Sequence, residues 1–434
     1  MINNKKALTR RHFMGLASAT AAAASMTPLN VAEGAYRRAI RPIVTGPRSA
    51  QSDDDWQDVL AAFDLGGRVT MNTANLAPAS APGRAVFTEL AASVDADPSF
   101  QNRGQFGALR QASREHVAAY LGANPDEIVF TRNTTESNNF VVHGLDLGPG
   151  DEVVLTEHNH PSNRASWQVR ARREGFSVVE VPVPSPPSEP QELMDALVAA
   201  TTPRTRVMSY SHVTNLGGCR YPAREINTWA RDRGILTLVD GAQSCGSIDV
   251  DLHGINCDFY TASGHKWPCA PREVGVLYVR SGSEERLWPS VVGVGFDESG
   301  AGGRMEALGQ RDDAALAAFG SAMAFLGEIG SINVAARVAA LTDYFKEELS
   351  GSSKVILYTP MDAEFSGGVL TFHIDGVDSR RGFQWLYQER KIVCASSGVE
   401  QGGIRFSPHI YTSMDGCERA LEAVKELIDG RVVL

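Results

Sequence analysis

Two stretches of this chain carry side chains that could do chemistry together. The apolar segment 235–239 leads into Asp240, and the segment 259–263 is followed closely by Lys266. Apolar segments that end in polar residues are typical of parallel strands, whose carboxyl ends meet at one crevice of a sheet. A lysine amine in a partly desolvated crevice can form a Schiff base, and a buried aspartate can hold a pyridinium nitrogen protonated. The pair therefore indicates pyridoxal 5'-phosphate (PLP).

Either stretch alone is weak evidence, because Asp-Gly is a common turn and most lysines are solvated surface charges. Together, the turn Asp-Gly-Ala-Gln at 240–243 and the segment Ser-Gly-His-Lys at 263–266 resemble the class V aminotransferase superfamily. This superfamily includes cysteine desulfurases, kynureninase and isopenicillin N epimerase. The resemblance implies that PLP would be held at its pyridine nitrogen by Asp240, at its phenolic oxygen by Gln243, at its phosphate by Ser263 and His265, and at its aldehyde by Lys266.

A polar turn at 132–139 follows an apolar strand and precedes an apolar helix. Residues of the N-cap type at such a turn leave backbone N–H groups at a helix start, where a phosphate is favoured. By itself the turn is an ordinary capped helix. Its similarity to the Thr-Glu-x-x-Asn element of the superfamily implies that Thr134 and Thr135 bind the phosphate.

Two more strand ends match superfamily segments. The strand 152–156 ends at Glu157 and His158, and the resemblance implies that an imidazole here stacks on the cofactor ring. We assign that role to His158. A second histidine, His160, follows two positions later, so the register of the match with the superfamily stays open. The strand 206–213 leads to Asn215 in a Ser-His-Val-x-Asn segment, which implies a hydrogen bond to the phenolic oxygen.

Three further residues are candidates through the same resemblance. Arg405, in an Ile-Arg-x-Ser segment, would clamp the substrate carboxylate, for which a planar guanidinium is well suited. Asn75, in the segment 69–78, is a candidate for substrate contact, although a turn-forming asparagine is the plainer interpretation. Gln310 stands where isopenicillin-N-epimerase-like proteins have threonine in a Gly-Thr-Arg-Asp segment that reaches the phosphate of the neighbouring subunit. That segment implies a homodimer.

The alternation of strands and helices, with chemistry confined to strand ends, predicts an open α/β sheet enzyme. The resemblance specifies the PLP-dependent transferase fold, like that of aspartate aminotransferase. We expect a large PLP-binding domain over 69–325 with a mostly parallel seven-stranded sheet, and a smaller α+β domain over 326–434. Residues 36–68 are expected to form a linker and N-terminal segment, poorly ordered up to Asp55 because they show no sustained periodicity.

Residues 1–35 are expected to form a signal peptide. Arg10 and Arg11 precede a short, Ala-rich apolar run, the order found in twin-arginine export signals. A basic disordered tail is the alternative, and the run is too short for a stable transmembrane helix. The prediction is a protein carried by the twin-arginine translocase to the periplasm after folding in the cytoplasm.

Composition narrows the function classes. Acidic residues outnumber basic ones 51 to 41 among 434 residues, and no basic stripe with interleaved aromatics supports nucleic-acid binding. No Cys-x-x-Cys or Cys/His spacing indicates a metal site. We expect most of the six cysteines to be core thiols: Cys219, Cys245, Cys257, Cys269, Cys394 and Cys417.

The residues do not specify which reaction the protein catalyses. Cysteine desulfurases carry a catalytic cysteine on a loop that corresponds to 395–402, and no cysteine lies there. The resemblance to the isopenicillin-N-epimerase-like branch implies an exported enzyme that acts at Cα of an amino acid or of the amino-acid end of a peptide-derived metabolite, such as a siderophore. Epimerisation, transamination, elimination and decarboxylation all remain open. A carbon–sulfur lyase or a desulfurase-like enzyme is the main alternative. A non-catalytic PLP-binding protein is disfavoured because Lys266 and Arg405 are both present.

Overall fold

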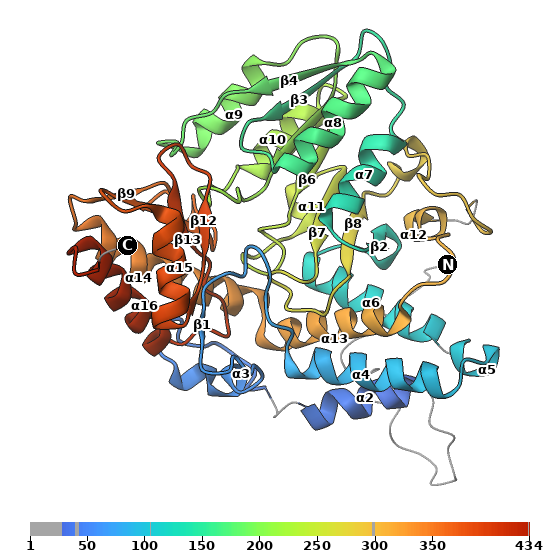
Figure 1. Ribbon diagram of the computed structural model, residues 1–434. Coiled ribbons are helices and arrows are strands. Elements are labelled where there is room, and N and C mark those ends of the chain that lie inside the picture. The colour runs from blue at the N-terminus through green and yellow to red at the C-terminus, as the bar shows by residue number, and fades with distance from the viewer. Residues whose placement is uncertain (1–27, 40–42, 105, 297–299, 433) are drawn as a thin grey trace.

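The computed structural model describes residues 28–39, 43–104, 106–296, 300–432 and 434 (Figure 1). Its main feature is a seven-stranded sheet, in which β8 runs antiparallel to both neighbours and the other adjacent strands run parallel. This confirms the predicted fold class. The strands, in their order across the sheet, are β2 (Ile128–Thr131), β8 (Gly275–Val279), β7 (Phe259–Ser263), β6 (Leu236–Asp240), β5 (Thr205–Ser211), β3 (Glu152–Thr156) and β4 (Ser177–Val181).

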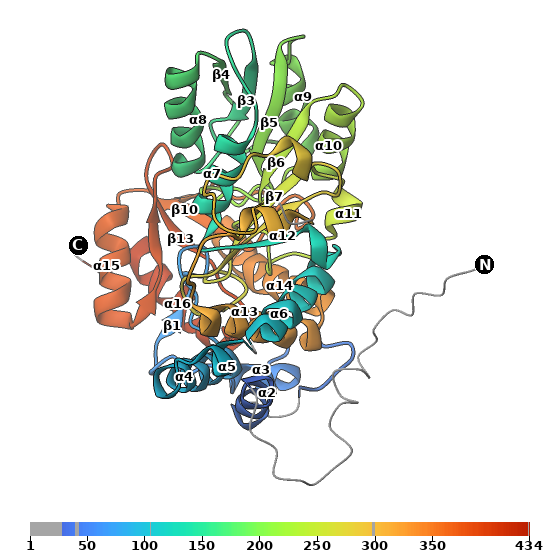
Figure 2. The ribbon, with the colours of Figure 1, turned by 90° about the vertical axis from the view of Figure 1, so that its right-hand side faces the viewer.

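Helices cover both faces of this large sheet, which is why most of its strands are apolar along their whole length. One face carries α7 (Thr134–Gly144) and α8 (Pro161–Glu174), and the other carries α9 (Pro190–Ala199), α10 (Ala223–Arg231) and α11 (Leu252–Ile255) (Figure 2). Below the sheet in Figure 1 lie α4 (Ala81–Ala96), α5 (Phe100–Arg103), α6 (Phe106–Leu121) and α13 (Asp313–Ile329). The short α12 (Gly300–Met305) follows the last strand of the large sheet.

The C-terminal part forms a four-stranded antiparallel sheet, here called the small sheet. Its strands, in order, are β12 (Ala395–Ser397), β13 (Gly403–Phe406), β10 (Leu370–Ile374) and β9 (Val355–Leu357). Its helices are α14 (Ser331–Ser350), α15 (Ser379–Arg390) and α16 (Met414–Ile428). The 69–78 segment joins this part of the fold, because β1 (Val69–Thr70) pairs with β11 (Ile392–Val393) and Asn72 bridges to Ser407. The predicted domain boundary at 325 remains a prediction, and α13 continues through it to Ile329.

The expectation of a poorly ordered linker is wrong for the described residues. Pro28–Ala39 forms α2, which lies along α4, and the short α3 (Gln57–Leu60) follows Trp56, whose side chain is fully buried. The indole of Trp56 donates to the Ser49 carbonyl at 2.9 Å. The guanidinium of Arg337 lies 5.4 Å from the Trp56 ring and donates to the Ala50 carbonyl at 2.9 Å. Core packing also holds the segment, because Ala32 and Ala35 of α2 pack in a cluster with Val86 and Leu90 of α4. The paired arginines at positions 10 and 11 lie outside the described residues.

No single helix among the described residues is long and apolar enough to span a membrane. Taken together, α13 and α14 are long and apolar enough, but they are bent by 81° at their junction.

Candidate active site

Asp240 lies at the end of β6, where two hydrogen bonds orient its carboxylate. The backbone N–H of Ala242 donates to Oδ1 at 3.0 Å, and Nδ2 of Asn138 on α7 donates to Oδ2 at 3.1 Å. The Asn138 carbonyl accepts from the Thr261 hydroxyl at 2.9 Å, which fixes the direction of its amide. Asp240 is 4% exposed. The carboxylate is therefore buried and held in one orientation. Asn138 belongs to the Thr-Glu-x-x-Asn match, but sequence reasoning gave it no role.

Lys266 lies just beyond the end of the neighbouring strand β7, within electrostatic reach of Asp240. Burial lowers the pKa of Lys266 to about 8, the carboxylate of Asp240 opposes that change, and the charge of Arg405 adds to it. At a pKa of about 8, roughly one amine in ten is uncharged at pH 7, against a few in ten thousand for an ordinary lysine. The structure thus brings together the two residues that the sequence pairs, and it makes the amine available as a nucleophile or base.

The start of α7 forms a polar cradle with the end of β7. The backbone N–H of Thr134 donates to the Ser263 hydroxyl at 2.9 Å, and the two hydroxyl oxygens lie 2.7 Å apart. Asn133 caps the helix by accepting from the N–H of Glu136 at 3.1 Å. Hydroxyls and the positive end of a helix dipole at one place favour an anion. Thr135 is exposed on the same first turn, 3.5 Å from the Ser162 hydroxyl.

Gly275 makes this cradle possible. A Cβ at this position would lie 2.7 Å from Cα of Asn133 and 2.8 Å from the Ala262 carbonyl oxygen. Only glycine lets β8 pass so close to the helix start and to β7.

His265 is half-buried beside Lys266. Burial lowers its pKa to about 4, and the positive charges of Lys266 and Arg272 contribute. Its imidazole is therefore neutral near pH 7. Its backbone carbonyl accepts from the N–H of Ala77 at 2.9 Å, which attaches the 69–78 segment to the site.

Of the two histidines after β3, His160 is the one that lies near the charged groups of the site. Burial lowers its pKa, while Asp240 raises it and Lys266 and Arg405 lower it, so all three charges lie near the ring. Nδ1 of His160 accepts from the N–H of Ser162 at 3.3 Å, which leaves Nε2 of the neutral ring carrying the proton. The position is therefore better matched to the stacked imidazole than that of His158.

His158 is turned toward the interior of the fold. Its Nδ1 lies 3.3 Å from the Tyr221 hydroxyl, which also donates to the Thr156 hydroxyl at 3.3 Å. Burial lowers the pKa of His158 to about 4, opposed by the charge of Glu157. Neither Asp240 nor Lys266 contributes to this change in pKa. His160 lies two positions after His158, so the choice between them shifts the register of the motif by two residues.

Gln243 is engaged in a buried link between three segments. Its Nε2 donates to the Ala74 carbonyl at 3.0 Å, and its Oε1 accepts from the Trp267 indole at 2.9 Å. The side chain thus connects the Asp240 turn, the Lys266 segment and the 69–78 segment. Its contact with a phenolic oxygen stays a prediction.

Arg405, on β13 of the small sheet, connects that sheet to the site. Its Nη1 donates to the backbone carbonyl of Asn215 at 3.0 Å, and its Nε has no hydrogen-bond partner among the described residues. Burial lowers the pKa of Arg405. Asn215 thus lies next to Arg405 through its backbone, and its hydrogen bond to the phenolic oxygen stays a prediction. A buried guanidinium with an unused donor beside Lys266 is suited to a substrate carboxylate.

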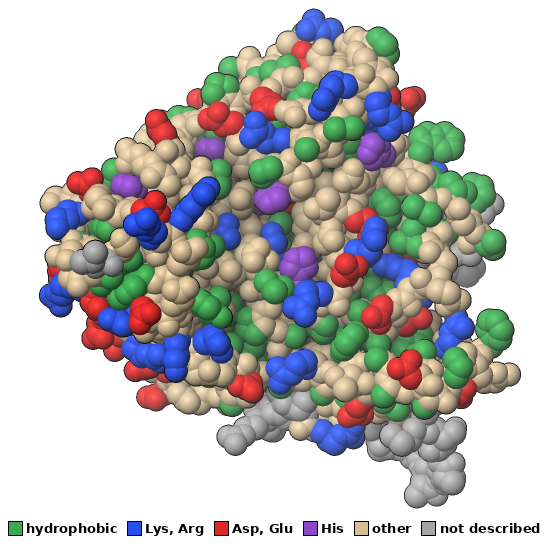
Figure 3. Space-filling model, viewed as in Figure 1, with side chains coloured by type: hydrophobic (Ala, Val, Ile, Leu, Met, Phe, Trp, Pro, Cys, Tyr) green, Lys and Arg blue, Asp and Glu red, His purple; other side chains and the backbone are tan. Residues whose placement is uncertain are grey.

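Two predicted residues are not brought to this centre by the single chain. The side chain of Asn75 is exposed, whereas Asn72 nearby has a buried Oδ1 without a partner among the described residues. Gln310 is exposed, and its Oε1 accepts from Arg103 at 2.5 Å. In the space-filling view, histidine and basic side chains lie in the hollow at the centre of the face shown (Figure 3).

The six cysteines are all buried and none is disulfide-bonded. Burial raises the pKa of each thiol, that of Cys394 to about 12. A reactive cysteine needs a thiolate near neutral pH. None of the six meets that condition. No group of three or more His, Cys, Asp or Glu residues that could hold a metal ion occurs in the described ranges.

A comparison with protein families matches residues 83–419 to the family model "Aminotransferase class-V". The chain belongs to the class V aminotransferase family. Among curated relatives, isopenicillin N epimerase from Streptomyces clavuligerus is 32% identical over 394 residues, covering 86% of this chain and 98% of the relative.

Solved structures of class V aminotransferase relatives show the same fold. A cysteine desulfurase from Thermococcus onnurineus superposes with a TM-score of 0.78 at 24% identity, covering 89% of this chain and 100% of the other. The cystine C–S lyase C-DES, with glycine covalently linked to its PLP cofactor, superposes with a TM-score of 0.76 at 23% identity, covering 82% and 96%.

The chain is thus a PLP-dependent class V aminotransferase-like enzyme, and its residues fit the cofactor. An uncharged fraction of the Lys266 amine suits the aldehyde, the oriented Asp240 carboxylate suits the pyridine nitrogen, and the cradle of Thr134 and Ser263 suits the phosphate.

Proposed function

We propose that this enzyme acts at Cα of an amino acid, or of the amino-acid end of a peptide-derived metabolite, as the isopenicillin-N-epimerase-like branch would. The observation that carries the proposal is the convergence of Lys266, Asp240 and Arg405 in a protein whose thiols are all buried. The charges of Asp240 and Arg405 both act on the pKa of Lys266, and all three charges act on the pKa of His160. Bound PLP draws electrons away from the bonds at Cα of an amino acid attached to it. The residues of the protein must then determine which of the bonds at Cα breaks.

Arg405 holds the carboxylate of the substrate, and the Asn215 carbonyl keeps its guanidinium in place. This anchoring at one end leaves the Cα hydrogen as the group that Lys266 can reach. The amine of Lys266, with its pKa lowered to about 8, takes up the proton from Cα and can return it. His160 offers a second hydrogen-bond donor at Nε2 near the same charges. The Asp240 carboxylate is held in one orientation by the donors from Ala242 and Asn138.

Deuterium exchange at Cα tests the proposal. In D2O the PLP-loaded enzyme should replace the α-hydrogen of a substrate amino acid with deuterium, as read by NMR, and Lys266→Ala should abolish the exchange. Chiral chromatography then separates epimerisation from keto-acid formation. Absence of exchange across the common L- and D-amino acids and a peptide-derived series would contradict action at Cα.

A carbon–sulfur lyase remains the second candidate, because elimination from an S-conjugate needs the same Cα proton transfer and no enzyme thiol. Release of pyruvate and ammonia from cysteine S-conjugates would favour it. A desulfurase is disfavoured by the buried Cys394, and Cys394→Ala should leave turnover close to that of the wild type. A non-catalytic PLP-binding role is disfavoured because both Lys266 and Arg405 are in place.

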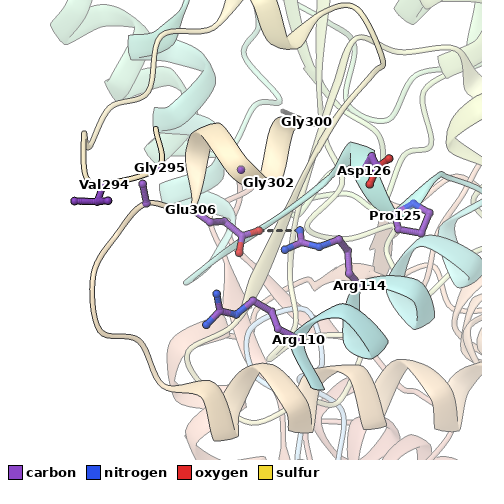
Figure 4. Close-up of a pocket in the computed structure, with 11 residues that line it drawn as sticks. Arg110, Arg114, Pro125, Asp126, Val294, Gly295, Gly300, Gly302 and Glu306 are labelled. Carbon is purple, nitrogen blue, oxygen red and sulfur yellow. Dashed lines mark hydrogen bonds and ion pairs between the residues drawn. The ribbon is translucent and has the colours of Figure 1, made fainter. Parts of the chain in front are cut away.

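We also propose that the active unit is a homodimer. Support comes from an exposed apolar segment within 288–296, whose exposed side chains are Trp288, Val291, Val292, Val294 and Phe296. Exposed apolar patches of this kind mark interaction sites. Beside it lies a hollow of about 330 Å³ in which Arg114 is paired with Glu306 at 2.9 Å (Figure 4). Since that pair neutralises itself and the hollow lies away from Lys266, we assign it to the interface rather than to catalysis.

Subunit mixing tests the shared site. If Gln310 serves the phosphate of the partner, inactive Lys266→Ala chains mixed with a defective Gln310→Ala chain should recover part of the activity. A fully active monomer in sedimentation would refute the dimer.

Export through the twin-arginine pathway to the periplasm is a further part of the proposal, and it rests on Arg10 and Arg11. Replacing both with lysine should leave folded, active enzyme in the cytoplasm. Cell fractionation that still finds the variant in the periplasm would point to another route. Siderophore tailoring is one periplasmic role compatible with this location.

A further inference from the structure

His409 contacts the backbone of the residue that follows Lys266. Its Nε2 donates to the Trp267 carbonyl at 2.7 Å, and the weaker donor Sγ of Cys269 lies 3.5 Å from the same oxygen. The imidazole also packs against the Trp267 ring, with the ring centroids 5.2 Å apart and the ring planes at 82°. Both side chains are fully buried. His409 therefore holds the turn that carries Lys266.

The protonation of this imidazole follows from its partner. A carbonyl oxygen can only accept, so Nε2 of His409 carries the proton. Burial lowers the pKa of His409 to about 4, and the hydrogen bond to Trp267 opposes that change, so the ring is neutral at pH 7. Nδ1 is then an acceptor that is buried without a partner among the described residues. Such atoms are rare and each calls for an explanation. A phenyl ring would avoid this cost, so the part of the side chain that the fold uses is the donor at Nε2.

Trp267 is fixed from two other sides. Its indole N–H donates to Oε1 of Gln243 at 2.9 Å. Its ring lies against Gly368, just before β10 of the small sheet, where a Cβ would come within 2.5 Å of Cη2 of the ring. The backbone N–H of Lys266 itself is only loosely held, 3.5 Å from the Ser263 carbonyl. The position of Lys266 therefore depends on the contacts of its neighbour Trp267.

The segment that carries His409 also carries Arg405, which lies four residues earlier on β13 (Gly403–Phe406). The backbone between them is anchored, because the N–H of Ser407 donates to the Met71 carbonyl at 2.8 Å. One short segment thus holds Arg405 at one end and the turn of Lys266 at the other. The distance between the guanidinium and the amine is set through this segment.

We propose that His409 is a positioning residue, which sets the reach of the Lys266 amine toward the Cα hydrogen of a substrate clamped by Arg405. It acts through the Trp267 carbonyl and not by contact with the reacting atoms. This inference rests on the proposed function, which assigns the carboxylate clamp to Arg405 and the proton transfer to Lys266.

The test compares two substitutions of His409. Phenylalanine keeps a ring and removes the donor, whereas Nε2 of glutamine can donate from nearly the same place. PLP is added to cofactor-free protein, and the growth of the visible absorption band gives the rate at which Lys266 captures it. The second rate is deuterium exchange at Cα, measured by NMR in D2O with saturating L-alanine, or with the common amino acid that exchanges fastest in the wild type. The dissociation constant of that amino acid comes from the visible spectrum.

We expect His409→Phe to slow both rates roughly tenfold, because the amine is no longer held in place. The dissociation constant should stay within about twofold, since Arg405 is unchanged. His409→Gln should keep both rates within about threefold of the wild type, because the donor is restored.

His373→Phe is the matched control. Nδ1 of His373, on β10, lies 3.1 Å from another backbone carbonyl, that of Gly402, and its loss should change neither rate. Wild-type rates in His409→Phe would overturn the inference, and so would equal losses in His409→Phe and His409→Gln, which would assign the effect to packing. If no amino acid exchanged its α-hydrogen in the wild type, the proposed function would fall, while the rate of PLP capture would still test the hold of His409 on Lys266.

Discussion

The buried amine of Lys266 should destabilise the cofactor-free protein at neutral pH, and Lys266→Met should relieve that cost. Burial lowers its pKa from the ordinary value of 10.5 to about 8. A difference of this size between the folded and unfolded states corresponds to about 3 kcal/mol of unfolding free energy. Methionine has a similar length and carries no charge to desolvate.

The sign follows from proton binding. Below pH 8 the lysine is protonated in both states, so the cost of burying the charge is fully present. Between pH 8 and 10.5 the unfolded chain binds more protons than the folded one, so stability of the wild type rises with pH. The advantage of Lys266→Met over the wild type should therefore be largest at pH 7 and shrink by about 3 kcal/mol by pH 10.5.

Urea unfolding of cofactor-free protein at pH 7, 8.5 and 10.5 measures this difference, since other titrating groups are common to both proteins. Lys425→Met is the control, because Lys425 is exposed and paired with Glu348 at 2.8 Å. Its effect should stay within about 0.5 kcal/mol at every pH. A Lys266→Met advantage that did not change between pH 7 and 10.5 would show that the ammonium is solvated in the folded protein, and the reasoning would fail.

Three other predictions follow from individual contacts. Asp240→Asn should keep most of its PLP while turnover falls roughly a hundredfold or more. The amide carries no charge, and its NH2 group would face a donor, either the N–H of Ala242 or Nδ2 of Asn138. A near-normal kcat would count against this role. Ser263→Ala should weaken PLP binding roughly ten- to a hundredfold in equilibrium dialysis, because it removes the hydroxyl that Thr134 holds in the cradle, and an unchanged dissociation constant would remove Ser263 from the phosphate site. Arg337→Met should lower the unfolding free energy by about 3 to 5 kcal/mol, because it leaves Asp53 and the Ala50 carbonyl without their buried partner, and a loss below about 1 kcal/mol would show that the N-terminal segment is not held by this contact.

Local chemistry made part of the site predictable. Asp240, Ser263 and Thr134 each follow an apolar strand or begin a capped helix, and such short-range patterns specify both the element and the place where it ends. A parallel sheet then gathers strand ends at one edge. The pairing of Asp240 with Lys266 could therefore be inferred before the fold was known.

The long-range contacts could not be inferred in this way. Arg405 reaches Asn215 across 190 residues of sequence, and Gln243 is engaged by Ala74 and Trp267. Asn138 became visible as the support of Asp240 only when α7 was packed against the sheet.

The choice between His158 and His160 shows the same difference between what the local sequence pattern and what packing determine. Sequence placed an imidazole after β3, because two candidates occur within three residues there, but both satisfy the local pattern equally. The tertiary structure separates them, since Tyr221 binds His158 in the interior and the charges around Lys266 surround His160. Residue type and spacing thus determined the cofactor, the strand ends and the pairing of Asp240 with Lys266. Which side chain faces the site, and which is occupied elsewhere, was decided by packing, because a hydrogen bond depends on the direction of groups that only the folded chain brings together.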